Sequence, residues 1–163
     1  MRLNESITIS AAPQLVWDHV TDPAKTLDYM SGVTRWEVAS DSRRDRGLGA
    51  RYRMLVRVGA TELGGLVEVV EFTEPSDMAW SSVTGIDQRG RWRLRELEDG
   101  RTRTELRFAY GVAGGGIAGM LSERLSAPSL SRHLRATLHQ LKRQVEHQKL
   151  RDDAAASRRE PVA

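Results

Sequence analysis

The hydrophobic pattern of this chain changes period once, and that change constrains the fold more than any other feature. Before it, apolar and polar residues alternate, most cleanly at 51–58 and 102–112, which is typical of strands with one buried face. Beyond the glycines at 114–116 the apolar residues form one helical stripe, which consists of Leu130, Leu134, Leu138, Leu141 and Val145. Because a sheet with one apolar face needs a cover, we expect an α+β fold, a curved antiparallel sheet wrapped around this long C-terminal helix.

The predicted elements are one strand, two short helices, six strands and one long helix. The first strand covers residues 2–10, and the short helices lie between Pro13 and Gly32. The later strands are expected at 33–39, 51–58, 62–72, 78–84, 90–97 and 102–112. The long helix is expected from residue 117 to about 148, kinked or split at Pro128. Residues 1–148 then form a single domain, and residues 149–163, which lack periodicity, form a flexible tail.

Composition excludes several classes of protein. Hydrophobic residues make up 39% and charged residues 29% of the 163 positions, as in a globular domain. No apolar run is long enough for a membrane helix or resembles a signal peptide, so we expect a cytoplasmic protein without integral membrane association. The net charge is +3, but arginines and acids are interspersed along the predicted strands, which argues against nucleic acid as a partner. With no cysteine, the chain has neither disulfides nor thiolate chemistry.

The order of these elements, together with several short motifs, resembles the START-like (SRPBCC) superfamily, and most closely its polyketide cyclase/dehydrase and lipid transport branch. The motifs are Ile7–Pro13, Val16–Trp17, Thr21–Pro23, Phe72–Pro75, Gly90–Leu94 and Asp99–Thr102. The resemblance covers residues 2–148 and implies a helix-grip fold with a deep cavity between sheet and helix. Members of the family bind lipids, sterols, hormones or polyketides, and include carriers, sensors, cyclases and proteins of no known activity. The fold alone does not choose among these functions.

Strand parity and the resemblance together predict which side chains face the ligand. Eight come from the sheet and the second short helix, and three from the long helix. The predicted ligand-binding residues are Tyr29, Trp36, Tyr52, Met54, Trp92, Leu106, Phe108, Tyr110, Leu130, His133 and Leu134. For each of them the alternative is packing in a solid core. The hydroxyls of tyrosines on this face, or of Ser81 or Ser82, would orient a ligand with a polar tip.

Two motifs admit a catalytic or cofactor role and also a simpler one. Residues 114–119 match G-x-G-x-x-G, but no strand follows them, so a strand-to-helix hinge is favoured over a dinucleotide site. This glycine run is either a gate for the ligand or a plain loop. His133 lies beside the apolar stripe. One interpretation is that it points into the cavity as an acid or base, and the other is that it lies on the solvent-facing flank of the helix. The other histidines show no metal-binding spacing, and no cofactor signature or catalytic set is evident.

Two carboxylates occupy positions that alternation assigns to the apolar side of a strand. Glu5 shares a face with Leu3 and Ile7, and Glu68 shares a parity with Phe72. A buried acid is costly unless it is paired or lines a wet cavity. The alternative for Glu5 is simple exposure near the end of the chain. The alternative for Glu68 is a surface position, which follows if Val67 and Val69 face inward.

Three functions remain open on the sequence. The first is the binding of a small hydrophobic or aromatic molecule in the cavity, with or without weak catalysis. The second is a cofactor-independent polyketide cyclase, aromatase or dehydratase that uses the same cavity. The third is a protein-interaction module with a solid core. The sequence leaves the identity of the ligand and the oligomeric state undetermined.

Overall fold

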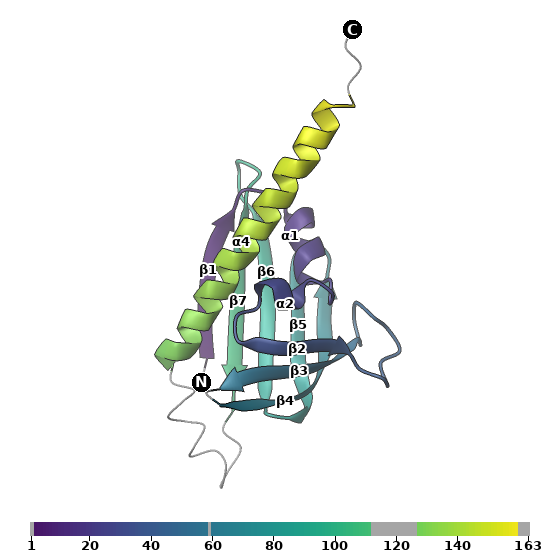
Figure 1. Ribbon diagram of the computed structural model, residues 1–163, viewed down its shortest axis with the longest axis vertical. Coiled ribbons are helices and arrows are strands. Elements are labelled where there is room, and N and C mark those ends of the chain that lie inside the picture. The colour runs from purple at the N-terminus through teal and green to yellow at the C-terminus, as the bar shows by residue number, and fades with distance from the viewer. Residues whose placement is uncertain (1, 59, 112–126, 160–163) are drawn as a thin grey trace.

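In the computed structural model, which describes residues 2–58, 60–111 and 127–159, a seven-stranded antiparallel sheet curls beside one long helix (Figure 1). The strands lie in the order β1-β7-β6-β5-β4-β3-β2. The elements are β1 (Arg2–Ile9), α1 (Pro13–Val20), α2 (Thr26–Tyr29), β2 (Val33–Val38), β3 (Arg51–Val58), β4 (Thr61–Thr73), β5 (Asp77–Gly85), β6 (Gln88–Glu96), β7 (Thr102–Tyr110) and α4 (Ala127–Ser157). The predicted α+β helix-grip fold is confirmed.

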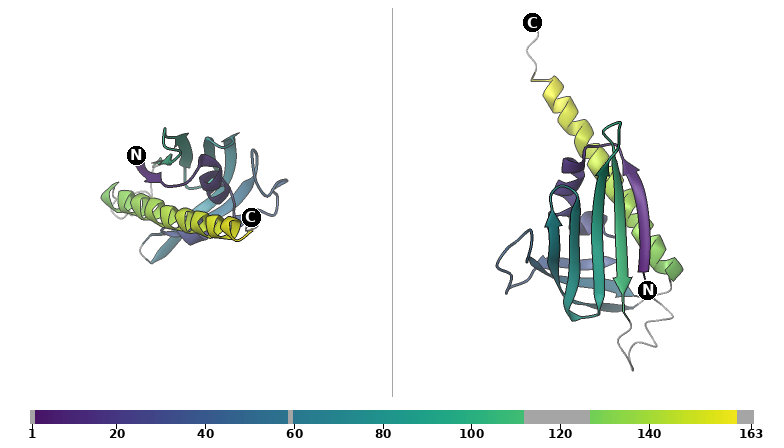
Figure 2. Two further views of the ribbon diagram at one scale, coloured as in Figure 1. Left: turned by 90° about the horizontal axis from the view of Figure 1, so that it is seen from above. Right: turned by 180° about the vertical axis from the view of Figure 1, so that it is seen from behind.

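The first and last strands are neighbours, although they are far apart in the sequence. Leu3 of β1 pairs with Phe108 of β7, and Ile9 pairs with Thr102. The short helices α1 and α2 lie on the same side of the sheet as α4, while the opposite side of the sheet is uncovered (Figure 2). The concave face of the sheet, beneath the three helices, therefore holds the core.

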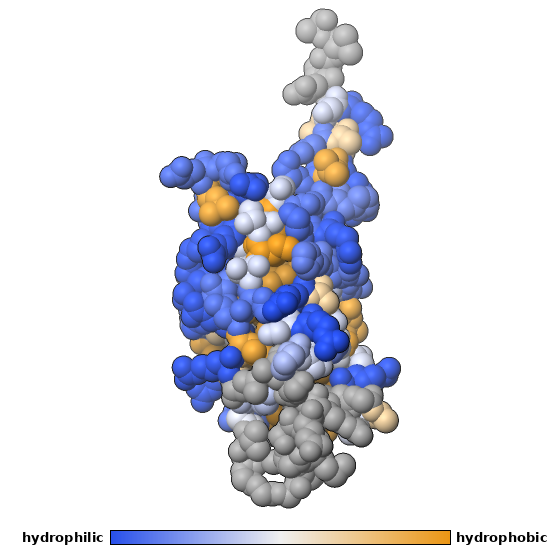
Figure 3. Space-filling view, turned by 90° about the vertical axis from the view of Figure 1, so that its left-hand side faces the viewer, coloured by the Kyte–Doolittle hydropathy of each residue, from blue (hydrophilic) through white to orange (hydrophobic). Residues whose placement is uncertain are grey.

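Helix α4 covers the edge strand β1 and is joined to it by polar contacts. The guanidinium Nε of Arg135 lies 3.0 Å from Glu5 Oε1, and Lys142 Nζ donates to the Thr8 carbonyl at 2.7 Å. Glu5 does face inward, as its parity predicts, and Arg135 pairs with its carboxylate at the margin of the core. On this side of the molecule, hydrophobic surface forms a strip between hydrophilic flanks (Figure 3).

Strand β4 contains a pair of glycines in close contact with its neighbours and two register shifts against β5. A Cβ at Gly64 would overlap the Met54 carbonyl oxygen, and one at Gly65 would overlap that of Thr84, so the strand backbones approach closely at this glycine pair. A register shift between Val69 and Glu71 leaves Val70 exposed and returns Phe72 to the core. Glu68 therefore lies on the outer face.

The core is built around tryptophans and the leucine stripe of α4. Leu138, Leu141 and Val145 are at most 2% exposed, and Leu134 is also buried. Trp80 lies over Gly90 on the next strand, where any Cβ would collide with the indole ring. Burial of the predicted inner-face residues confirms the strand parity inferred from the sequence.

The predicted end of the long helix is wrong. Helix α4 continues beyond residue 148 to Ser157, and its last turns project past the sheet (Figure 1). Leu150 in these turns is exposed, and pairs spaced i, i+4, such as Lys149 with Asp153 at 2.8 Å, stabilise them. Residues 117–126, where the helix was expected to begin, lie outside the described residues, as does the glycine motif at 114–119.

The outer face of the sheet carries a cluster of paired charges where β5 begins. Asp77 is 8% exposed and lies between Arg91, Arg93 and Arg95, at 3.5, 3.1 and 3.0 Å. Burial alone would raise the pKa of this carboxyl, but hydrogen bonds from Arg95 and Arg93 hold the pKa below its usual value. The dense arginine pattern of β6 thus forms an ion-pair cluster with Asp77.

Candidate functional site

A small apolar pocket opens between the concave face of the sheet and the first turns of α4. We call it the helix-end pocket. Its volume is about 50 Å³, and its lining comes from β3, β4, the β5–β6 turn, the start of β6, β7 and α4. The lining residues are Val56, Leu63, Gly64, Ile86, Gln88, Phe108, Tyr110 and Leu130. All except Gln88 and Tyr110 are half-buried, so the pocket has a wall of partly exposed apolar groups.

Gln88 brings a buried amide to this apolar wall. It is the first residue of β6 and is only 4% exposed. Its Nε2 donates to Met54 Sδ at 3.4 Å, which joins β6 to β3 across the curled sheet. Its Oε1 accepts no hydrogen bond from any residue that the structure describes. A buried carbonyl oxygen without a donor is uncommon and needs an explanation.

Tyr110 lies directly beside Gln88, because the two residues are register partners on β7 and β6. Its ring is 6.3 Å from that of Phe108, centroid to centroid. Burial raises the pKa of the Tyr110 hydroxyl, so the group is neutral at physiological pH. The pocket wall therefore combines a neutral phenol and a neutral amide with apolar side chains.

Three predicted site residues meet at this pocket: Phe108, Tyr110 and Leu130. Seven others belong to the buried core and pack against one another or against the helices. They are Tyr29, Trp36, Tyr52, Met54, Trp92, Leu106 and Leu134. Trp36 stacks on Tyr52 with ring centroids 5.1 Å apart, and Tyr29 meets Trp92 edge-on at 6.2 Å.

The hydroxyls of two core tyrosines already have acceptors in the protein. Tyr29 donates to the Val20 carbonyl at 3.4 Å, and Tyr52 donates to the Asp45 carbonyl at 2.7 Å. Burial raises the pKa of both, that of Tyr52 to about 12. These hydroxyls anchor local structure.

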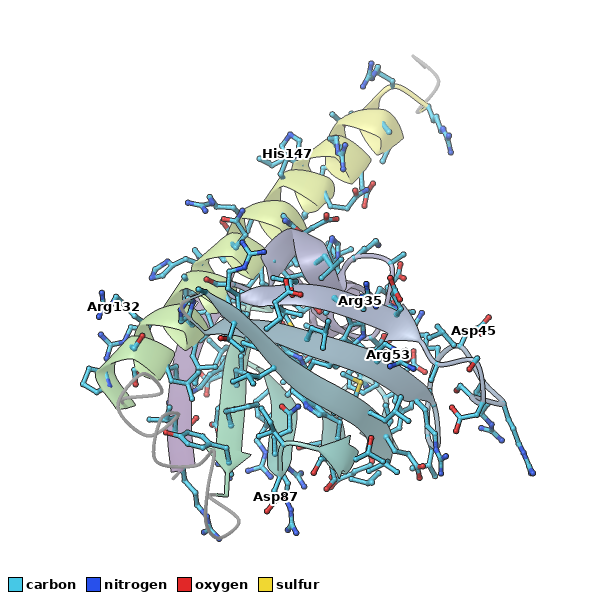
Figure 4. The ribbon with its side chains drawn as sticks, turned by 60° about the horizontal axis from the view of Figure 1, so that its bottom comes forward. Arg35, Asp45, Arg53, Asp87, Arg132 and His147 are labelled. Atoms are coloured by element: carbon cyan, nitrogen blue, oxygen red, sulfur yellow. The ribbon has the colours of Figure 1, made fainter. Side chains whose placement is uncertain are left out.

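His133 lies on the exposed face of α4 and does not line the helix-end pocket. Its Nδ1 is 2.9 Å from Ser31 Oγ. One helical turn further along α4, the Thr137 hydroxyl oxygen accepts a hydrogen bond from the Ser31 backbone N–H at 3.0 Å. These contacts tie the segment after α2 to the long helix. His147 likewise stands on the outside of α4 (Figure 4).

The two serines that the sequence offered for ligand orientation lie elsewhere. Ser82 Oγ accepts from the Gln88 backbone N–H at 3.2 Å and lies 3.4 Å from Asp87 Oδ1, so it shapes the β5–β6 turn. Ser81 lines an open groove of about 870 Å³ on the outer face of the sheet. Arg91 borders that groove and donates to Glu71 Oε1 at 2.9 Å. The groove is therefore a charged open surface and not an enclosed site.

The predicted set of ligand-binding residues omitted Val56, although alternation places it on the same face as Met54, and the sequence analysis missed Leu63, Gly64, Ile86 and Gln88 as pocket residues. The expected strand began at Gly90, two residues too late, and so excluded Gln88. Gln88 lies an even number of positions before Trp92 along β6, so alternation would have placed it on the same inner face. In the described parts of the chain no cluster of three or more His, Asp or Glu side chains is placed to hold a metal ion. Nor does any helix there have the length and apolar character to span a membrane.

Comparisons with known proteins agree with this architecture. A sequence model of the family described as polyketide cyclase / dehydrase and lipid transport matches residues 1–146. A search of curated proteins finds no match.

Two solved structures illustrate the similarity of fold. Protein TTHA0849 from Thermus thermophilus is 20% identical, with a TM-score of 0.73 over 89% of this chain and 97% of that one. The Zhui aromatase/cyclase from a Streptomyces species is also 20% identical, with a TM-score of 0.72 over 90% of this chain and 93% of its own. At such identities the likeness concerns the fold alone.

Proposed function

This chain belongs to the polyketide cyclase/dehydrase and lipid transport family, and from that premise we propose that it binds a small hydrophobic or aromatic molecule at the helix-end pocket. The observation that carries the proposal is the composition of the pocket wall: six apolar or glycine positions surround one amide and one phenol. Apolar surface drives binding at about 25 cal/mol per Å² removed from water, and a few polar groups fix orientation.

The size of the pocket limits how a ligand can enter. Its volume is about 50 Å³, whereas pockets for drug-sized ligands are roughly 300–1,000 Å³. One end of a ligand fits the space as it stands, and the body of the ligand must displace side chains at the rim. Phe108 and Leu130 are half-buried, so their movement costs less than opening the core would.

The alternative is a cyclase, aromatase or dehydratase reaction in the same pocket. Such a reaction needs a group that donates or accepts a proton. Among the described residues that line the pocket, Tyr110 is the one titratable side chain. Its raised pKa keeps the hydroxyl protonated, so it is not available as a base, and makes it a weak proton donor. This favours binding over catalysis. If a reaction does occur, Tyr110→Phe should abolish turnover while binding survives.

The proposal is tested by blocking the pocket. Val56→Trp places a large ring in the pocket, and Val83→Trp is the matched control, because Val83 is also a strand valine but is 45% exposed. We would measure thermal shifts against fatty acids, sterols, flavonoids and aromatic polyketides. A ligand at a hundredfold excess over its Kd stabilises the native state by about 2.7 kcal/mol.

The expected result is that at least one compound stabilises the wild-type protein and Val83→Trp, but not Val56→Trp. Equal stabilisation of all three proteins would place binding elsewhere. If no compound in the panel shifts the transition, the proposal fails and the solid-core interaction module gains support.

A further inference from the structure

The buried carbonyl oxygen of Gln88 carries an inference about the chemical class of ligand. We infer that the helix-end pocket takes a neutral hydrophobic molecule whose inner end bears a hydrogen-bond donor, such as a phenol or an alcohol, and that Gln88 Oε1 accepts that hydrogen bond. The inference rests on the proposed function, since it concerns the same pocket.

The first argument is the unmet hydrogen-bonding capacity of Gln88. The side chain is buried at 4% exposure, and Oε1 has no donor among the residues that the structure describes. Other buried polar atoms without a partner, such as Trp17 Nε1, belong to residues that do not line this pocket. Gln88 lines the pocket, so a ligand that displaces the side chains at the rim brings its donor to this buried, unpaired acceptor.

The second argument is that the amide is held in place before any ligand arrives. The Gln88 backbone N–H donates to Ser82 Oγ at 3.2 Å, which fixes the start of β6. The Nε2 group donates to Met54 Sδ at 3.4 Å, which orients the amide. Oε1 is then the end of the amide that has no donor among the described residues. Because these contacts order the side chain in advance, little conformational entropy is lost when Oε1 accepts a hydrogen bond.

The third argument is charge. None of the described residues that line the pocket is an arginine or lysine, so a buried carboxylate or phosphate would have no counter-ion there. Asp87, which precedes Gln88 in the β5–β6 turn, is exposed at this end of the sheet (Figure 4) and adds negative charge there. The carbonyl and Asp87 both disfavour anions. Fatty acids in their ionised form are therefore expected to bind worse than uncharged donors.

Three para-substituted pentylbenzenes test this preference, because they share one body and differ only at the tip. They are 4-pentylphenol, 4-pentyltoluene and 4-pentylbenzoate, with a donor, an apolar group and an anion in turn. By isothermal titration calorimetry at neutral pH, we expect the phenol to bind about tenfold more tightly than the toluene, the effect of one buried hydrogen bond. The benzoate should bind most weakly.

Gln88→Met tests the residue itself, because methionine has a similar length and no strong acceptor. In this variant the phenol should lose its tenfold advantage, while the affinity for the toluene stays the same. Circular dichroism verifies folding, and Gln88→Leu replaces the first variant if that one fails to fold. A phenol preference that survives in a folded variant overturns the inference.

Two further outcomes separate this inference from the proposed function. If phenol and toluene bind wild-type protein equally, and Val56→Trp blocks both, then the pocket binds ligands but Gln88 does not select donors. The inference is then overturned, and the proposed function stands. If none of the three compounds nor any member of the wider panel binds, the proposed function is overturned and the inference with it.

Discussion

The two ends of the space between α4 and the sheet are packed differently. At one end, which we call the packed end, Ile9, Val16, Trp17, Leu141 and Val145 are fully buried, and α1 closes the core beside α4. At the other end, the helix-end pocket is lined by side chains that are mostly half-buried. One helix and one sheet thus build both a dense core and an incompletely filled site.

This difference suggests how the molecule divides its tasks. Close packing at the packed end removes most apolar surface from water and supplies the stability of the fold. The pocket end contributes less to the stability of the fold, so its residues are less constrained by packing and can be selected for ligand binding. Variation in ligand preference among such domains would then be expected at the pocket end.

The largest expected effect comes from shortening the same residue type at the two ends of α4. Leu141 is 0% exposed, so Leu141→Ala should cost about 2–5 kcal/mol of unfolding free energy by leaving a cavity. Leu130 is half-buried beside existing empty space, so Leu130→Ala should cost about 1 kcal/mol or less. Urea denaturation measures both, and equal losses would remove the distinction between the ends.

A smaller effect is expected at the pocket wall, with the opposite sign. Gln88→Met removes a buried unpaired carbonyl and should stabilise the ligand-free protein by about 1 kcal/mol. Gln144→Met is the control, because the Gln144 amide donates to the Asp28 carbonyl at 2.7 Å and its loss should not stabilise. Denaturation of the two variants side by side measures the difference. A marked destabilisation by Gln88→Met would mean that the amide is structural.

The smallest effect concerns pH at the packed end. Burial lowers the pKa of His19, against the opposing effect of its hydrogen bond to the Leu15 carbonyl at 3.0 Å. A group with a lowered folded-state pKa stabilises the fold at high pH, and that contribution declines as pH falls below the unfolded value of about 6.5. Melting temperatures between pH 8 and pH 5 should fall more steeply for wild type than for His19→Gln.

The exposed His133 supplies the matching control for this titration. His133→Gln removes an exposed histidine from a different helix, α4, and should leave the part of the slope that depends on His19 intact. Identical slopes for wild type and His19→Gln would show that His19 does not couple pH to folding.

The overall fold was predictable because hydrophobic period reports directly on secondary structure. Alternation predicted the inner face of the strands, and the stripe from Leu130 to Val145 predicted the covering helix. The same signal failed beyond residue 148, where α4 projects past the sheet. A helix without a packing partner needs no apolar stripe, and there polar pairs such as Lys149 with Asp153 support it.

The candidate site was only partly predictable, because parity gives the face of a strand and not the depth of packing. Trp36 and Trp92 share the inner face with Phe108, yet they belong to the core cluster while Phe108 reaches the pocket. Which side chains leave space depends on how the sheet curls around Gly64 and Gly65 and on where the turn after Gly85 places Gln88. Those are tertiary features with little local signal.

The central claim is that ligand binding belongs to the pocket end and leaves the packed end unchanged. The most direct test is a titration of ¹⁵N-labelled protein with 4-pentylphenol, followed through backbone amide shifts. The account predicts saturable shifts at Phe108, Tyr110 and Leu130, and none at Trp17 and Leu141. Shifts centred on the packed end or the outer face of the sheet, with none at the pocket, would contradict it.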